Sequence, residues 1–178
     1  MGIMHGFLCR LSPARLAQLK ENPSLIAELA EARADGDIPG MLDLDKAWHA
    51  LDVILAHKNE QGVLGDAILA RGGSKFGPPL SFGPARLLEP NRVKAVADAL
   101  GSIPEDLVRQ RYADLKNASV HGGYGAEVAA ADDPKYLKDK TAKNRETEIA
   151  ELTSALEGVC ELYREAAAQG HAMLVGVV

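Results

Sequence analysis

The chain has 178 residues, enough for one compact domain that buries its own apolar core without disulfides or a structural metal. Lys and Arg number 20 against 25 Asp and Glu, a formal net charge of -5 at pH 7. This balance provides no chain-wide basic field that would attract a phosphate backbone. We therefore expect a single domain over residues 1–178 that does not bind nucleic acid.

The two cysteines, Cys9 and Cys160, lie in apolar sequence surroundings and lack the Cys-x-x-Cys or Cys/His spacing of zinc and redox sites. They are typical of buried, reduced thiols. The N-terminal stretch MGIMHGFLCRLSPARL has neither the charged start nor the cleavage pattern of a signal peptide. No window reaches the roughly 20 apolar residues that a membrane helix requires. We expect a cytoplasmic protein without a membrane anchor, a bound metal or a cofactor.

The expected elements begin with a strand over residues 3–10. Ser12-Pro13 and Asn22-Pro23 each place a capping residue before a proline, which favours a helix start. Short helices are predicted over 13–20 and 23–33. The segment LDLDKAWHAL then opens a third helix, predicted over 45–57, because its apolar residues recur with helical spacing. They form one stripe: Leu44, Ala47, Trp48, Leu51, Ile54 and Leu55.

A helix is predicted over 63–70, followed by GGSKFGPPLSFGP, whose Gly and Pro content favours a long loop without regular structure. A strand over 85–88 and a helix over 90–100 come next. Ser102 and Glu105 have the spacing of a capping box for a further helix that reaches Tyr112. Residues 117–134 leave loop and short extended segments as open alternatives.

The last helix has the clearest periodicity in the chain, and it ends at Gly170. Its apolar face is made of Ile149, Leu152, Leu156, Val159, Cys160, Tyr163 and Ala167. The terminal run AMLVGVV is apolar at nearly every position, as in a strand at the centre of a sheet. The elements together predict an α/β fold, a small mixed sheet with helices on both faces, whose two terminal strands are neighbours.

Four segments, taken in order, resemble the YfbM-like family of bacterial proteins of unknown function. They are MGIMHGFLCRLSPARL, LDLDKAWHAL, FGPARLLEPNRVKAVADAL and YREAAAQGHAMLVGVV. The resemblance covers most of the chain and implies a compact α/β fold, and it brings no established activity. Residues 118–146 depart from the family pattern by their greater length and irregular composition.

The LDLDKAWH segment supplies the first candidate site. Asp45 and His49 lie one helical turn apart, so the carboxylate could orient the imidazole as a general base or share a metal with a distant ligand. The simpler interpretation is that Asp43 or Asp45 caps the helix and Trp48 anchors it in the core. Asp52 then falls with Asp45 and His49 on a narrow arc beside the core.

The Gly/Pro loop and the GPARLL segment supply the second candidate site. Glycines permit close backbone approach to a phosphate, with Lys75 and Arg86 supplying positive charge, but such loops normally lead into a helix and this one leads into a strand. A buried Arg86 would need a carboxylate or a ligand as its partner, and Asp43 or Asp45 is the expected carboxylate. His5, His121, Tyr124 and His171 are interpreted as ordinary loop or strand residues.

No nucleophile elbow, zinc-protease helix, Walker loop or dinucleotide fingerprint occurs in the sequence. The leading hypothesis is a non-catalytic binding module, a monomer or small homo-oligomer, for a protein or small-molecule partner. Its expected binding groove lies between the LDLDKAWH helix and the Gly/Pro loop. The alternative is an enzyme of undefined class with His49 as general base, Asp45 as its orienting carboxylate and Arg86 as anion holder.

Overall fold

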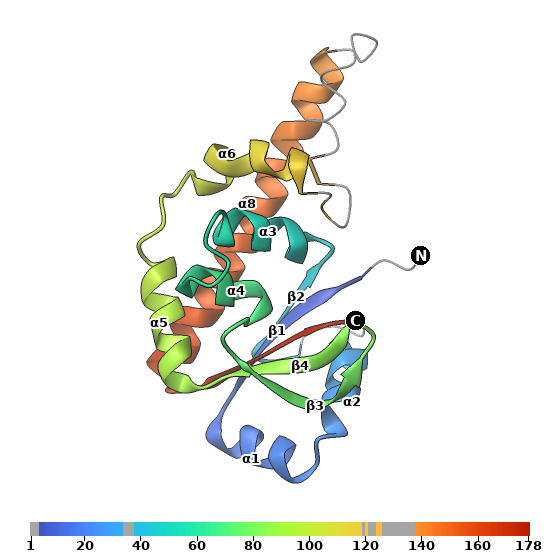
Figure 1. The fold of residues 1–178 in the computed structure, drawn as a ribbon, viewed down its shortest axis with the longest axis vertical. Helices are drawn as coiled ribbons and strands as arrows, with labels where there is room; N and C mark the ends of the chain where they lie inside the picture. Colours follow the sequence, from blue (N-terminus) through green and yellow to red (C-terminus); the bar gives the residue numbers. More distant parts are fainter. Residues whose placement is uncertain (1–3, 34–37, 119, 121–123, 126–137) are drawn as a thin grey trace.

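The computed structural model describes residues 4–33, 38–118, 120, 124–125 and 138–178. These residues form a five-stranded sheet with helices on both of its faces (Figure 1). The strand order is β2-β1-β5-β4-β3. The strands are β1 (Gly6–Leu11), β2 (Met41–Asp45), β3 (Ser74–Leu80), β4 (Gly83–Leu88) and β5 (Ala172–Val177). The predicted α/β domain is confirmed.

The sheet differs from the expected mixed sheet because all of its strand pairs are antiparallel. β3 and β4 are joined only by Ser81 and Phe82, a connection too short for a parallel crossover. The two terminal strands, β1 and β5, pair from Gly6↔Val177 to Leu11↔Ala172. The prediction that both chain ends share the sheet, with the last strand at its centre, is therefore confirmed.

Strand β3 corrects the prediction of a long irregular loop. The segment SKFGPPL pairs with β4 despite its two prolines, and the register shifts between Phe76 and Pro79. Proline cannot donate to a strand ladder, so it is confined to edge strands and bulges, and β3 is the edge of this sheet. The prediction that this Gly- and Pro-rich segment has no regular structure is therefore wrong for residues 74–80.

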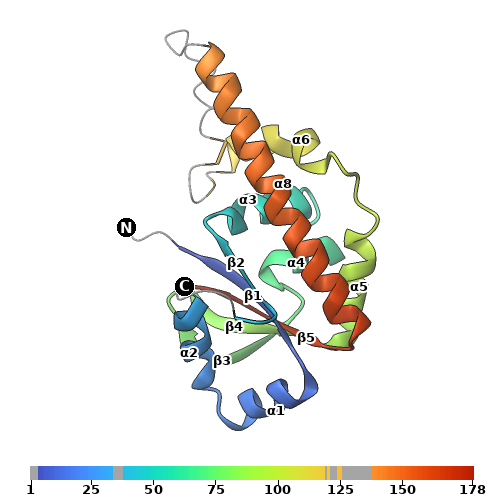
Figure 2. The same cartoon turned by 180° about the vertical axis from the view of Figure 1, so that it is seen from behind.

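The helices divide the core into two clusters, one on each face of the sheet (Figures 1 and 2). α1 (Pro13–Glu21) and α2 (Leu25–Ala32) cover one face. The larger cluster lies on the other face, under the remaining helices. These are α3 (Ala47–Ala56), α4 (Asp66–Leu69), α5 (Pro90–Leu100), α6 (Leu107–Arg111) and α8 (Lys138–Ala168), with 3₁₀ turns at Val63–Gly65 and Tyr112–Asn117.

Helix boundaries follow some of the predicted capping signals and not others. The Ser12 hydroxyl accepts a hydrogen bond from the Arg15 backbone N–H at 3.2 Å, as the Ser-Pro signal predicted. The Ser102 and Glu105 capping box is not formed, because Ser102 donates to the carbonyl of Asp98 and closes the end of α5 instead. α6 begins only at Leu107.

The long helix α8 confirms the predicted apolar face. Ile149, Leu152, Val159 and Tyr163 are buried in the larger core, and Gly170 follows the helix with a φ of +65°. The N-terminal end of α8 extends beyond the sheet (Figure 2). No helix among the described residues is long and apolar enough to cross a membrane. His121 and most of the segment 117–134 lie outside the described residues.

Candidate functional site

The LDLDKAWH segment joins a strand to a helix. The predicted helix is confirmed as α3, which begins at Ala47, two residues after the predicted start at Asp45. Residues 41–45 form strand β2, which was not predicted. Strand alternation places Leu42 and Leu44 on the larger core, and Asp43, opposite Phe7 of β1, on the other face. The same spacing also fits a helix stripe for a few residues, which is why the two periods were confused.

Neither aspartate caps α3, which has Lys46 at its N-cap and no side-chain hydrogen bond there. Asp43 instead accepts a hydrogen bond from the Asp45 backbone N–H at 2.7 Å and pairs with Arg33 at 2.9 Å. Asp45 has a φ of +47° and pairs with Nδ1 of His5 at 2.8 Å. The predicted capping role is therefore replaced by a role in the turn from β2 to α3.

Trp48 is buried, as predicted for a core anchor, and its indole N–H donates to the carbonyl of Met4 at 3.2 Å. The ring of His49 stacks on the indole with 5.0 Å between centroids. The ion pair formed by Asp45 is with His5. A binding role for Asp43, Asp45, Trp48 and His49 stays a prediction.

Arg86 is not brought to either of the expected carboxylates. It lies on β4, three strand spacings from β2 or about 14 Å across the sheet, whereas Asp43 and Asp45 lie on β2. Its Nη1 group donates to the carbonyls of Arg71 at 3.2 Å and Gly73 at 3.1 Å. The Gly/Pro segment therefore contacts Arg86 through the backbone carbonyl of Gly73, next to that of Arg71. Two cavities border the Gly/Pro segment, at Gly72–Ser74 and at Phe82–Pro84, and neither has a lining residue from α3.

The buried carboxylates of Asp52 and Asp66 each bind an arginine side chain, which was not predicted from the sequence. Asp52 receives both Nη groups of Arg71 at 2.6 Å, and this hydrogen bond raises the pKa of Arg71 above its usual value. Asp66 accepts from the Gly72 N–H at 2.6 Å and from Nε of Arg92. An aspartate inside an apolar helix face was the only available signal, and it does not reveal the partner. Within the described ranges no three His, Cys, Asp or Glu side chains are grouped to hold a metal ion.

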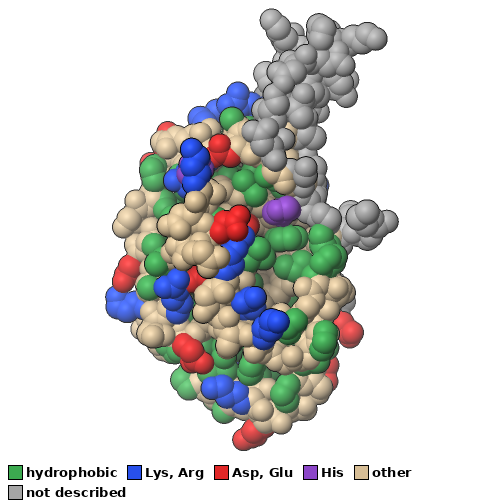
Figure 3. Space-filling view, in the orientation of Figure 1, with side chains coloured by type: hydrophobic (Ala, Val, Ile, Leu, Met, Phe, Trp, Pro, Cys, Tyr) green, Lys and Arg blue, Asp and Glu red, His purple; other side chains and the backbone are tan. Residues whose placement is uncertain are grey.

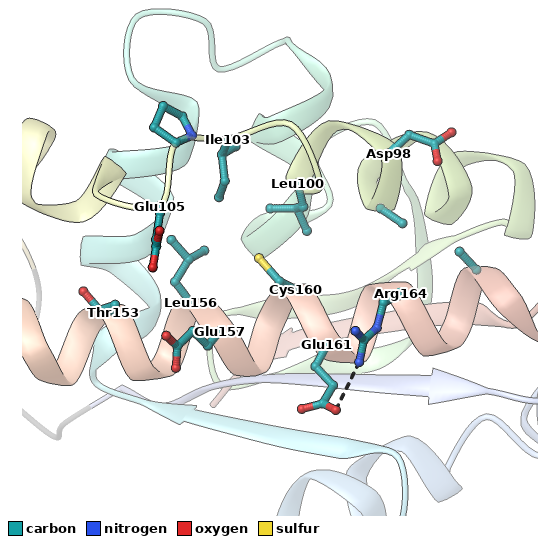
Figure 4. Close-up of a pocket in the computed structure, with 14 residues that line it drawn as sticks. Asp98, Leu100, Ile103, Glu105, Thr153, Leu156, Glu157, Cys160, Glu161 and Arg164 are labelled. Carbon is teal, nitrogen blue, oxygen red and sulfur yellow. Dashed lines mark hydrogen bonds and ion pairs between the residues drawn. The ribbon is translucent and has the colours of Figure 1, made fainter.

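The largest cavity of the described residues is an open groove of about 590 Å³ between α5, the following connection and α8 (Figure 4). α5 packs along α8 because both present small and apolar side chains to one another. Leu100 and Leu156 are almost fully buried beneath it. The apolar floor consists of Ala97, Leu100, Ile103, Pro104, Leu156, Cys160 and Ala167.

The rim of this groove is acidic. Its carboxylates are Asp98, Glu105, Glu157 and Glu161, against the single guanidinium of Arg164. Glu161 pairs with Arg164 at 3.3 Å, and Asp98 pairs with Lys94 at 2.8 Å. Glu105 and Glu157 take part in no ion pair within the described residues. The groove therefore carries a net negative charge.

Cys160 lies on α8 at the floor of the groove and points toward Leu100 (Figure 4). Burial raises the pKa of its thiol above the usual value. Because the thiolate is the nucleophile, a raised pKa lowers its reactivity at neutral pH. Burial raises the pKa of Cys9 to about 11. Cys9 is buried, as predicted from sequence, whereas Cys160 is only half-buried.

The comparisons with known proteins agree with the fold. Residues 1–176 match the family described as a domain of unknown function, DUF1877. Among solved structures, the chain resembles the protein of unknown function YfbM from Escherichia coli, with a TM-score of 0.64 and 20% sequence identity over 98% of this chain and 99% of that one. No curated protein matches the chain. The chain therefore belongs to the DUF1877 family, as its YfbM-like motifs implied.

Proposed function

We propose that this chain is a binding module whose groove between α5 and α8 holds a basic amphipathic helix of a partner protein. The observation that carries the proposal is the combination of an apolar floor with an acidic rim in the largest cavity of the described residues. An amphipathic helix binds such a groove by its apolar face, and charged residues beside that face select the partner.

The shape of the groove supports an elongated ligand. Its residues on α8 run from Thr153 to Ala167, a span of about 21 Å at the rise of an α-helix. A partner helix of about 14 residues would match that length. Small floor residues such as Ala97 and Cys160 leave room for larger apolar side chains of the partner.

The charges of the groove support a basic ligand. Glu105 and Glu157 are available to pair with Lys or Arg of a partner, since neither has an ion pair among the described residues. The exposed Asp98–Lys94 pair is also weak enough to rearrange, because such surface pairs contribute about 0–1 kcal/mol. The rim charges would chiefly raise the association rate and make it salt-dependent.

The enzyme hypothesis has less support. It requires Asp45, His49 and Arg86 in one concave site, and the strand order separates Arg86 from the other two. The groove between α5 and α8 is lined by neither Asp45 nor His49. Binding is therefore the function that the geometry supports best.

The test uses the full chain and a fluorescently labelled 16-residue peptide designed as an amphipathic helix, with Leu on one face and Lys on the other. Saturable binding is expected by fluorescence anisotropy, with no binding of a matched peptide that has Glu in place of Lys. The double variant Glu105→Gln/Glu157→Gln should weaken binding about fivefold, from two exposed charge pairs. The matched double variant Glu21→Gln/Glu28→Gln, exposed on the helices of the other face, should leave it unchanged.

Alkylation of Cys160 gives a second readout at the groove floor. Saturating peptide should slow the reaction of Cys160 with iodoacetamide, while the more buried Cys9 stays slow with or without peptide. Equal loss of affinity in the two double variants, or an unprotected Cys160 at saturation, would show that the peptide binds by charge alone outside the groove and would refute the proposal.

A further inference from the structure

Arg86 is a half-buried cation without a carboxylate partner among the described residues. Its Nη1 group is fixed by two backbone carbonyls, which hold the guanidinium in place without neutralising it. Its Nε and Nη2 groups have no acceptor in the described part of the chain. The buried side-chain nitrogens that lack a partner do not include Nε or Nη2 of Arg86. Both groups are therefore accessible to solvent. A fixed guanidinium with free N–H groups is the arrangement that binds carboxylates and phosphates best.

Arg71 lies beside Arg86 and differs from it in one respect. Both Nη groups of Arg71 are taken by Asp52 at 2.6 Å, so its charge is compensated inside the protein. Lys75 lies opposite Arg86 in the pairing of β3 with β4, and therefore on the same face of the sheet. Lys75 has no ion pair among the described residues, so it adds to the positive field at Arg86. Lys and Arg side chains gather on this face over α4 and β4 (Figure 3).

Arg86 lines a pocket of about 220 Å³ at the end of the sheet, between α4, the β3–β4 turn and β5. No carboxylate side chain lines it. Arg71, whose charge Asp52 compensates, lines it as well. The apolar side chains of the lining are Leu69, Phe82, Pro84, Val175 and Val177. Phe82 is 61% exposed, the one large hydrophobic side chain that is exposed among the described residues. A concave pocket that combines apolar side chains with an uncompensated cation fits a ligand that has both an apolar part and a negative charge.

We infer that this pocket is a second binding site, separate from the groove, and that it takes a small organic carboxylate. The carboxylate accepts hydrogen bonds from the free Nε and Nη2 groups of Arg86. The apolar body of the ligand lies against Phe82 and Val175. The volume is below the range typical of drug-sized ligands, about 300–1,000 Å³, so the ligand is small.

The test is a titration of the ¹⁵N-labelled full chain with benzoate, followed by two-dimensional NMR. The amide signals of Gly83 and Gly176, which line the pocket, report on binding. Benzoate should shift both signals with one saturation curve. Benzamide, the neutral matched compound, and inorganic phosphate, an anion without an apolar body, should each bind at least about tenfold more weakly.

Two variants separate binding from folding. Arg86→Gln removes the guanidinium and its charge, so it should abolish the benzoate shifts. Phe82→Ser changes an exposed side chain, leaves the fold intact and should weaken binding severalfold. The control Arg15→Gln removes an exposed guanidinium on α1, under the other face, and should leave binding unchanged.

Three results would overturn the assignment. These are the absence of saturable benzoate shifts at Gly83 and Gly176, equal binding of benzamide or phosphate, and unchanged benzoate binding in Arg86→Gln. The outcome is independent of the peptide experiment, because the two sites share no lining residue.

Discussion

The buried carboxylate of Asp66 provides a quantitative test of the packing around α4. Its side chain is 2% exposed, and its two oxygens accept from the Gly72 N–H and from Nε of Arg92. Asp66→Asn keeps the side-chain volume and one carbonyl oxygen, which can still accept the hydrogen bond from the Gly72 N–H. It places an amide N–H group or a neutral oxygen against the guanidinium of Arg92, so the charge-assisted hydrogen bond is lost.

The magnitude follows from the two contacts. A hydrogen bond to a charged group contributes about 1.5–3 kcal/mol. The bond from Gly72 is weakened further because its acceptor becomes neutral. Arg92 is 36% exposed and can regain hydration, which keeps the loss below the 3–5 kcal/mol of a fully buried broken pair. We expect Asp66→Asn to lower the free energy of unfolding by about 2–3 kcal/mol, or the melting temperature by about 5–10 °C.

Urea denaturation at pH 7, followed by circular dichroism, measures this change. The control is Asp98→Asn, which removes a carboxylate from an exposed pair with Lys94, 68% and 67% exposed, and should cost at most about 0.5 kcal/mol. If the two variants unfold at the same urea concentration, the carboxylate of Asp66 does not hold the 66–73 segment and the reasoning fails.

Two further predictions concern the junction of β1 with α3 and the alkaline limit of stability. A Cβ at Gly6 would lie 2.4 Å from Cβ of Trp48, so Gly6→Ala must shift α3 and should lower the free energy of unfolding by about 1–3 kcal/mol in urea denaturation. Burial and the nearby charge of Glu151 raise the pKa of Tyr124 to about 12. Because the unfolded pKa is about 10, the contribution of Tyr124 is complete below pH 10 and is lost between pH 10 and 12, and Tyr124→Phe should reduce that loss in a pH series of thermal melts.

Each of these has a matched comparison. Gly101→Ala at the end of α5 has only ordinary contacts, 3.5 Å or more, and a helical φ of -66°, so it should be neutral or slightly stabilising. A Gly6→Ala variant as stable as Gly101→Ala would show that α3 can move freely at Trp48. If Tyr124→Phe lost thermal stability between pH 10 and 12 as steeply as the unmodified chain, other groups would dominate that range. Tyr163, whose pKa is also raised by burial, is one such group.

The parts of the fold that were predicted correctly depend on local signals. The Ser12 cap, the apolar face of α8 and the all-apolar strand β5 are each encoded within a few residues. Strand β2 was missed because a five-residue alternation overlaps with a helical stripe. Strand β3 was missed because Gly and Pro favour loops, whereas their tolerance at a sheet edge depends on which strand lies beside them.

The candidate sites depend on contacts between distant parts of the chain, which no local pattern carries. The groove combines residues of α5 and α8 that lie about sixty positions apart, and each helix alone looks like ordinary amphipathic surface. Arg86 was singled out from sequence as a residue that would need a carboxylate or a ligand if buried, and the structure holds it by two backbone carbonyls instead. The partner was misassigned, because whether a carboxylate of β2 can reach β4 is decided by the strand order.

The LDLDKAWH segment illustrates how a distinctive motif can encode a turn. Asp45 has a positive φ, a conformation in which Asp and Asn are enriched among residues other than glycine, and Asp43 accepts the hydrogen bond from its N–H. Gly6 supplies the close approach that lets Trp48 pack on β1. Three positions of the motif are thus accounted for by the passage from β2 to α3. His49 stacks on Trp48 at the edge of this junction, so a ligand there would have to bind the stacked pair.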